Sequence, residues 1–244
     1  MTRKLLRGRI LSFRSEPQTP DDTQSFDYIE DGALIISDGK IKAVGPYTNL
    51  RLQANGAKEI DHHPHILMAG FIDTHIHFPQ VQVVASWAEQ LLDWLNTYTF
   101  PEETRYVDAT HAKAMASRFY DQLLDHGTTT TMAYCSVHKT SAEAYFEEAA
   151  KRNMRVIGGK VLMDRNAPDG LMDTPQSGYE DSKALIDKWH GKGRAQNAIT
   201  PSFAITSTPE QMEMAGVLVA EHPECFVQTH LSENHDEITY TAEL

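Results

Sequence analysis

The chain has 244 residues, of which 41% are hydrophobic, so it can bury a sizeable core and is not a disordered segment. Its 22 basic and 34 acidic side chains give a net charge of −12, which argues against nucleic acids and anionic membrane surfaces as partners. No apolar run approaches the roughly 18 residues that cross a bilayer, and no signal peptide is recognisable. The isolated cysteines, Cys135 and Cys225, are typical of buried thiols in a reducing cytoplasm. We therefore expect a cytoplasmic protein with a small, weakly charged substrate.

Residues 1–67 have the pattern of a small β-domain. Leu5–Phe13 is predicted to be a strand. Two further strands, 33–37 and 40–44, flank Asp38-Gly39, a dipeptide that supplies the positive φ angles of a tight hairpin turn. This part of the chain is therefore predicted to be the N-terminal portion of a β-sandwich domain.

From residue 68 onward the pattern changes to strands that alternate with helices. Strands are predicted at 70–77, 128–136, 155–163, 197–206 and 225–232. This alternation predicts right-handed crossovers and a parallel sheet. Because a closed (β/α)₈ barrel has eight units, residues 68–244 are predicted to form an incomplete TIM-like barrel of about five β/α units. The fold class is therefore α/β with a small N-terminal β-domain.

The predicted helices begin at recognisable capping sequences. Apolar residues at helical spacing occupy 106–125, and Gly127 is placed to end that helix. Three later helices are predicted to open at Thr140–Glu143, Ser177–Glu180 and Thr208–Gln211. Each lies between two predicted strands, as a parallel sheet requires.

Phe71–His77 ends in two histidines, His75 and His77, at spacing i, i+2. Alternate side chains share one face of a strand, so both imidazoles project together at the strand's carboxyl end, where barrels carry their active sites. Two converging imidazoles suit Zn²⁺, with Fe²⁺ as the alternative. The spacing by itself also fits two polar residues at a strand end. The preceding Gly-Phe-Ile-Asp-Thr sequence favours the metal site.

His230 and Glu233 follow the fifth predicted strand. Taken alone they are also compatible with a solvated strand end. The first and fifth strands of a barrel face each other across its mouth, so His230 is placed to complete a set of three histidines. Glu233 is then placed to move protons beside the metal.

The remaining histidines are predicted to be structural. His62, His63 and His65 flank Pro64 and are predicted to lie in a solvated turn between the two domains. His126 lies at a helix C-terminus, where a positive charge interacts favourably with the helix dipole. No ligand-like spacing connects His111, His138, His190, His222 and His235.

Gly70–His77 resembles the signature of the amidohydrolase superfamily, which implies a metal-bearing barrel flanked by a β-sandwich. Within that superfamily the chain is similar to the guanine deaminase family. The segments that carry this similarity are His77–Gln80, Leu91–Glu102, Met163–Pro168 and Thr229–Asn234. Together they extend from residue 77 to residue 234 of the chain.

The resemblance implies zinc-dependent hydrolytic deamination of guanine to xanthine and ammonia. The ligands of the single metal ion match His75, His77 and His230, and the proton-carrying acid matches Glu233. The substrate-binding positions match His77, Gln80, Ser202 and Phe203. The implied partner is a small purine, not a nucleic acid or a membrane, and the resemblance allows a homodimer.

The chain departs from the family pattern in three respects. Ser202 stands where the family has an arginine that binds the purine carbonyl, and Ala69 replaces a proline. A fourth histidine and a metal-binding aspartate, expected after strands six and eight, are absent, so we expect the chain to be cut short. Two alternatives stay open: an amidohydrolase that deaminates a related amino-heterocycle, and a catalytically incomplete fragment that at most binds zinc or a partner chain.

Overall fold

The computed structural model describes residues 3–244, apart from the side chain of Leu92. Residues 1 and 2 of the predicted β-domain therefore lie outside the described residues. The chain divides into two compact units, Met1–Ala69 and Gly70–Leu244. Within the described part of the chain, no helix combines the length and the apolar character that crossing a membrane requires.

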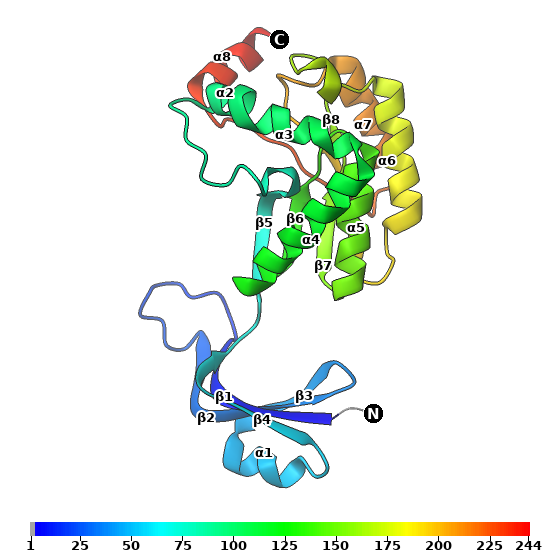
Figure 1. Cartoon of the computed structure of the whole chain (residues 1–244). Coiled ribbons are helices and arrows are strands. Elements are labelled where there is room, and N and C mark those ends of the chain that lie inside the picture. The colour runs from blue at the N-terminus through cyan, green and yellow to red at the C-terminus, as the bar shows by residue number, and fades with distance from the viewer. Residues whose placement is uncertain (1–2) are drawn as a thin grey trace. The chain divides into compact units, whose positions relative to one another are not determined.

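The first unit is a four-stranded sheet with strand order β3-β2-β1-β4 (Figure 1). Its strands are β1 (Arg3–Phe13), β2 (Phe26–Ser37), β3 (Lys40–Pro46) and β4 (Lys58–Leu67). Strand β2 pairs antiparallel with β1 and β3, whereas β4 pairs parallel with β1. Asp38 and Gly39 connect β2 to β3 with φ angles of 52° and 73°, so the predicted hairpin is confirmed.

The prediction of β-structure alone in residues 1–67 is incomplete, because helix α1 (Tyr47–Gln53) follows β3. Tyr47 and Leu50 of this helix are buried against Leu5 and Ile35 of the sheet. One sheet cannot bury its apolar face without a covering layer, and α1 supplies that layer.

The prediction of a turn at His62, His63 and His65 is wrong, because all three residues lie in strand β4. The backbone N–H of His63 donates to the Asp61 carboxylate at 2.9 Å within this strand. Pro64 lacks a backbone N–H, but β4 is an edge strand of the sheet, where a missing donor is tolerated.

The second unit contains a parallel sheet with strand order β10-β9-β7-β6-β5, and β8 adds to β9. Its strands are β5 (Phe71–His77), β6 (Thr128–Tyr134), β7 (Arg155–Gly159), β8 (Val161–Leu162), β9 (Ala195–Pro201) and β10 (Phe226–Val227). Every pairing between them is parallel. The connecting helices are α4 (Ala109–Asp125), α5 (Lys139–Arg152), α6 (Pro175–Trp189) and α7 (Pro209–Glu221), with α8 (His235–Glu243) last (Figure 1). The predicted α/β class and incomplete TIM-like barrel are confirmed.

Three predicted strands end clearly earlier than expected or are interrupted. The strand predicted at 197–206 is β9, which already ends at Pro201. The strand predicted at 155–163 is interrupted at Lys160, whose buried ammonium binds Asp173 and divides it into β7 and β8. The strand predicted at 225–232 pairs only over Phe226–Val227, because β9 is its one neighbour among the described residues. Residues after Val227 therefore leave the sheet and approach the loop that follows β9.

Two helix ends follow their predicted caps. Thr208 accepts a hydrogen bond from the backbone N–H of Gln211 at the start of α7, as predicted. Gly127 follows the end of α4 with a φ of 83°, the left-handed conformation that glycine adopts most easily. At the other end of α4, Asp108 accepts from the backbone N–H of Thr110.

Two other helix starts differ from the prediction. Helix α5 begins at Lys139 after His138, without a side-chain cap, so Thr140 lies inside its first turn; the Thr140 hydroxyl donates to the carbonyl of Tyr106 at 2.5 Å. Helix α6 begins two residues earlier than predicted, since Thr174 and Ser177 form the reciprocal capping pair. In both cases a hydroxyl bound a partner other than the one that local sequence suggested.

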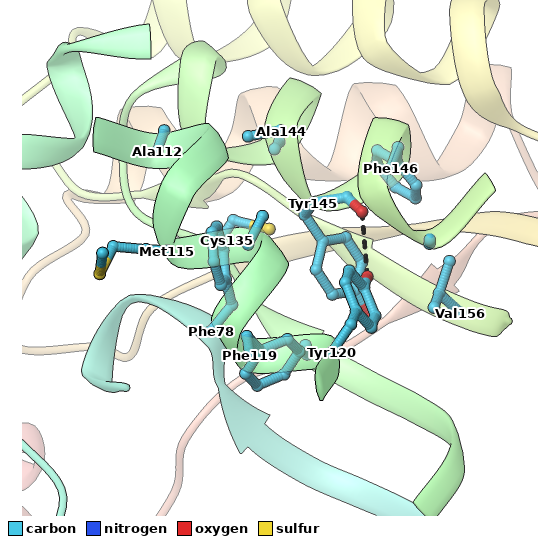
Figure 2. Packing of buried hydrophobic residues seen from close by; sticks show 14 of the residues in the cluster. Phe78, Ala112, Met115, Phe119, Tyr120, Cys135, Ala144, Tyr145, Phe146 and Val156 are labelled. Carbon is cyan, nitrogen blue, oxygen red and sulfur yellow. Dashed lines mark hydrogen bonds between the residues drawn. The ribbon is translucent and has the colours of Figure 1, made fainter. Parts of the chain in front are cut away.

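Aromatic side chains of α4 and α5 form the largest core of the second unit. Phe119 and Tyr120 of α4 pack with Tyr145 and Phe146 of α5 and with Phe78 (Figure 2). The buried hydroxyl of Tyr120 donates to the backbone carbonyl of Tyr145 at 3.0 Å. A buried hydroxyl without a partner would cost about 1–3 kcal/mol. This bond therefore joins the two helices as well as satisfying the phenol.

Candidate metal centre

Three histidines meet at the carboxyl end of the parallel sheet. His75 and His77 project from the end of β5, and His230 lies in the segment after β10. One ring nitrogen from each lies within 4.8 Å of the others. The Nε2 atoms of His77 and His230 are 2.9 Å apart. The structure thus brings together His75 and His77, as alternation along the first strand predicts, and His230 from the segment after the fifth predicted strand.

The orientation of His230 is fixed by the main chain. Its Nδ1 atom lies 2.9 Å from the carbonyl oxygen of Ser202, and its backbone N–H donates to the same oxygen at 2.9 Å. A carbonyl can only accept, so Nδ1 carries the proton and Nε2 keeps a free lone pair directed at His77. This is the tautomer that a metal-ligating imidazole needs.

Burial favours the neutral form of two of these imidazoles, those of His77 and His230. Burial, followed by the neighbouring His230 and His75, lowers the pKa of His77 to about 3. Burial also lowers the pKa of His230, although the bond to Ser202 and the charge of Glu233 act in the opposite direction. Neutral imidazoles are the ligands that Zn²⁺ or Fe²⁺ takes.

Tyr134 forms the floor of the histidine group and was missed by the sequence analysis. It ends β6 and is buried, with its ring stacked 4.7 Å from that of His77 and 4.2 Å from that of His230. Burial raises the pKa of its phenol to about 12. The only sequence signal is its position at a strand end. That signal does not distinguish it from a packing residue.

A cavity of about 250 Å³ adjoins the histidines. Short helical segments between β5 and α4 supply much of its wall: a 3₁₀ turn (Phe78–Gln80), α2 (Leu91–Trp94), a π-helical turn (Leu95–Thr99) and α3 (Phe100–Thr104). Its lining includes the predicted residues Gln80, Ser202, Phe203 and Glu233 beside the three histidines. Apolar walls with a few converging polar groups are typical of sites for small ligands.

Phe203 contributes an aromatic face to this cavity. Its side chain is buried, and its ring centroid lies 6.2 Å from that of His230 at an interplanar angle of 75°. Trp94 and Phe100 line the same cavity, and the indole N–H of Trp94 donates to the carbonyl of Ser86 at 3.1 Å. The cavity therefore has flat aromatic surfaces suited to a planar ring.

Glu103 also lines the cavity and was missed by the sequence analysis. It directly follows the segment Leu91–Glu102. In the sequence, the pair Glu102-Glu103 resembles the solvated start of a helix. Both side chains are in fact buried. Local sequence gave no sign of this, because burial here depends on residues far from α3 in the chain.

A second group of possible ligands, His190, Glu224 and Cys225, lies at the amino end of the same sheet. The Nδ1 atom of His190 accepts the backbone N–H of Asn197 at 3.1 Å, so that lone pair is already engaged. Cys225 Sγ lies 3.4 Å from the same nitrogen. Its partial burial, less than predicted, raises the thiol pKa to about 11 and disfavours the thiolate that binds metals. We assign no metal site there.

Comparison with known proteins places this arrangement in a family. Residues 66–244 match the sequence model of the amidohydrolase family. The chain belongs to the amidohydrolase family. The matched range contains the three converging histidines and the whole parallel sheet described above.

The amidohydrolase relatives that it matches most strongly include guanine deaminases. The chain is 46% identical to the guanine deaminase of Escherichia coli strain K12 over 100% of its own length and 56% of the relative's. A crystal structure of guanine deaminase from Bradyrhizobium japonicum superposes with a TM-score of 0.95 at 41% identity, covering 100% of this chain and 53% of that one. Guanine deaminase from C. acetobutylicum, solved with guanine bound in its active site, gives 0.87 at 31% identity, covering 99% and 56%.

The chain thus spans about half the length of the amidohydrolases it matches. The shared half includes the first unit and the parallel sheet of the second unit. It therefore carries the histidines, the cavity and Glu233 on residues that the structure describes.

Proposed function

We propose that the protein is a guanine deaminase that hydrolyses guanine to xanthine and ammonia with one bound metal ion. The observation that carries this proposal is the meeting of His75, His77 and His230 inside a cavity with flat aromatic walls and a carboxylate. The similarity to guanine deaminases, one of them solved with guanine in its active site, supports the choice of substrate.

The three imidazoles would hold the metal through their ring nitrogens. His230 fits this role because its Nδ1–H donates to the Ser202 carbonyl, so its Nε2 atom is the unprotonated ring nitrogen. Zn²⁺ is the proposed ion and Fe²⁺ the alternative, since both accept imidazole ligands. When bound, such an ion supplies a Lewis acid that lowers the pKa of a water molecule toward neutrality.

The cavity would hold guanine as a flat ring. Phe203 would stack on one face of the purine, an interaction that contributes about 1–3 kcal/mol for a stacked base. The Gln80 amide can both donate and accept hydrogen bonds at the purine edge. The Ser202 hydroxyl is shorter and uncharged compared with the arginine of the family pattern, so it would bind the purine carbonyl less strongly.

Glu233 would move the protons of the reaction. Glu233 lines the same cavity as His230, and its charge raises the pKa of that imidazole, which supports a role close to the metal site. Hydrolytic deamination requires one proton on a ring nitrogen and another on the departing amine. A single carboxylate that accepts a proton and passes it on serves both transfers.

The experiment is an assay of the full-length protein with guanine as substrate. We expect stoichiometric ammonia and xanthine, at a turnover within the usual enzyme range of about 1–10³ s⁻¹. A chelator should abolish the reaction and added zinc should restore it. Turnover of another amino-heterocycle with none of guanine would contradict the proposal. Ser202 is the residue that favours this alternative substrate class.

We further propose that residues 1–67 belong to a β-sandwich domain and residues 68–244 to the barrel domain. The four-stranded sheet and the parallel sheet support these assignments. A cytoplasmic location and a homodimeric state complete the proposal. Imaging of a tagged protein and analytical ultracentrifugation test these last two points.

A further inference from the structure

Helix α8 begins two residues after Glu233, and its first turn contains one buried acidic side chain. Glu237 is only 4% exposed, whereas Asp236 and Ile238 on either side of it are exposed. A glutamate is rarely buried unless hydrogen bonds or an opposite charge compensate its carboxylate. The burial of Glu237 therefore calls for specific partners.

The partners of the Glu237 carboxylate are backbone groups of the segment that carries Glu233. Its Oε1 atom accepts from the backbone N–H of Ser232 at 2.9 Å, and its Oε2 atom accepts from the backbone N–H of Glu233 at 2.5 Å. Ser232 has a φ of 60°, and a turn of this kind directs consecutive N–H groups toward one anion. A backbone N–H can only donate, so each contact has one possible direction.

The start of α8 fixes Glu237 in turn. The side-chain oxygen of Asn234 caps the helix by accepting from the backbone N–H of Glu237 at 2.9 Å. In an ordinary capping box, the third helical residue binds the backbone of the cap residue itself. Here the glutamate reaches past Asn234 to the two residues before it. Tyr240 connects the same helix to the segment after β8, because its hydroxyl accepts from Asn166 Nδ2 at 3.1 Å.

The segment between β10 and α8 is thus held at two separate points. On its amino side, the backbone N–H and the Nδ1 atom of His230 bind the Ser202 carbonyl. On its carboxyl side, Glu237 is the hydrogen-bond acceptor that the described residues offer to the two N–H groups. Leu231 lies between the two points and is 75% exposed, so packing adds little there. The first point orients a metal ligand, and the second orients the backbone of Glu233.

We propose that Glu237 is a positioning residue that fixes the backbone of Glu233 and so holds its carboxyl group in place for proton transfer. This inference rests on the proposed function, in which Glu233 carries the protons. A group that transfers a proton must lie within hydrogen-bond reach of its partner, and a displacement of about 1 Å can lower a rate about 10²-fold. Because the contacts of His230 with Ser202 do not involve Glu237, its loss should impair proton transfer far more than metal binding.

The first test is a double-mutant cycle in the full-length protein with guanine as substrate. Glu237→Gln replaces one acceptor oxygen with an amide donor that faces a backbone N–H. It is expected to lower kcat about 10- to 100-fold, with the KM for guanine and the zinc affinity each changed less than about threefold. In a Glu233→Gln background it should change kcat less than about twofold, since its effect acts through Glu233. Losses that multiply in the double variant would overturn the positioning role.

Two further variants separate the contacts from the charge. Asp236→Asn removes an acidic charge from the same helical turn, and Asp236 does not contact the backbone of Ser232 or Glu233, so kcat is expected to stay unchanged. Glu237→Asp keeps both carboxylate oxygens on a side chain one carbon shorter and is expected to recover part of the kcat that Glu237→Gln loses. A loss of kcat in Asp236→Asn equal to that in Glu237→Gln would show that the charge of the helix start matters and not the two contacts.

The second test needs no turnover. Hydrogen–deuterium exchange of the full-length protein, measured by mass spectrometry on peptides that cover residues 231–238, reports the amides of Ser232 and Glu233. Both should be protected in wild type and Asp236→Asn and should exchange rapidly in Glu237→Gln. Equal exchange in wild type and Glu237→Gln would overturn the contacts, and lost protection with an unchanged kcat would overturn the positioning role. If the wild-type protein fails to deaminate guanine, the proposed function falls, and the exchange rates still decide whether Glu237 holds this backbone.

Discussion

The two ends of the parallel sheet each gather three potential metal ligands, and only one end is suited to a metal. At the carboxyl end, His230 Nδ1–H donates to the Ser202 carbonyl, so Nε2 is the unprotonated ring nitrogen. At the amino end, the Asn197 N–H donates to His190 Nδ1 and occupies that lone pair. Proximity of histidine, cysteine and glutamate is therefore insufficient. Whether the nearest backbone group is a hydrogen-bond donor or an acceptor decides which ring nitrogen carries the proton and which can bind a metal.

The largest expected effect concerns the carboxylates at the two ends. Glu233→Gln in the full-length protein should lower kcat for guanine by about 10²–10⁴-fold, since an amide keeps the shape but cannot carry the proton. Glu224→Gln at the amino end should leave kcat unchanged. Ammonia release at saturating guanine measures both. A loss smaller than tenfold for Glu233→Gln would show that another group carries the proton.

Measurements of zinc affinity compare the histidines at the two ends of the sheet directly. His230→Ala should weaken zinc affinity more than about 100-fold, because removal of outer-shell partners alone costs about 10–100-fold. His190→Ala should leave the affinity unchanged. Competition with a chromophoric chelator gives both dissociation constants. Equal losses in the two variants would mean that the amino end also binds the ion.

The buried side chain of Glu103, which lines the cavity, predicts that the stability of the fold depends on pH. The pKa of Glu103 is raised from 4.5 to about 8 by burial, so between these values the folded chain holds the proton more tightly than the unfolded chain. Stability conferred by the neutral form is therefore lost as pH rises toward 8. Relative to wild type, metal-free Glu103→Gln should gain on the order of 2 kcal/mol between about pH 5 and pH 8.

Urea unfolding at several pH values with a chelator present measures this difference. Glu224→Gln is the control, because Glu224 is exposed and its pKa is lowered, chiefly by a backbone hydrogen bond. A constant difference between Glu103→Gln and wild type over this pH range would contradict the raised pKa.

The smallest expected effect concerns Ser202. Ser202→Arg in the full-length protein should raise kcat/KM for guanine about tenfold, because a guanidinium adds a charge-assisted bond to the purine carbonyl. Its effect on zinc affinity should be negligible, since His230 bonds the backbone of residue 202. Steady-state kinetics with guanine decides the point. An unchanged kcat/KM would show that another residue already binds the carbonyl.

The parts of the fold that could be predicted depend on short-range patterns. The turn at Asp38-Gly39 needs positive φ angles, which that dipeptide supplies locally. The pair His75 and His77 shares one face because strand geometry repeats every two residues. The cap at Thr208 likewise lies within one turn of its partner.

The missed parts depend on contacts between distant segments. Helix α5 begins before Thr140, whose hydroxyl instead donates to the carbonyl of Tyr106, 34 residues away. Tyr134 and Glu103 resemble packing and surface residues in the sequence, and only the folded chain places them at the histidines and the cavity. Burial of a carboxyl is set by what surrounds it in space, which local sequence does not encode.

The contact between His230 and residue 202 has a consequence for how such a site can diversify. Both hydrogen bonds that hold His230 end on the main-chain oxygen of residue 202. Every amino acid has this backbone oxygen. The side chain at position 202 is therefore not needed to orient His230. Exchange of the side chain at residue 202 can therefore change which ring substituents the cavity accepts, while the backbone contact that orients His230 is kept.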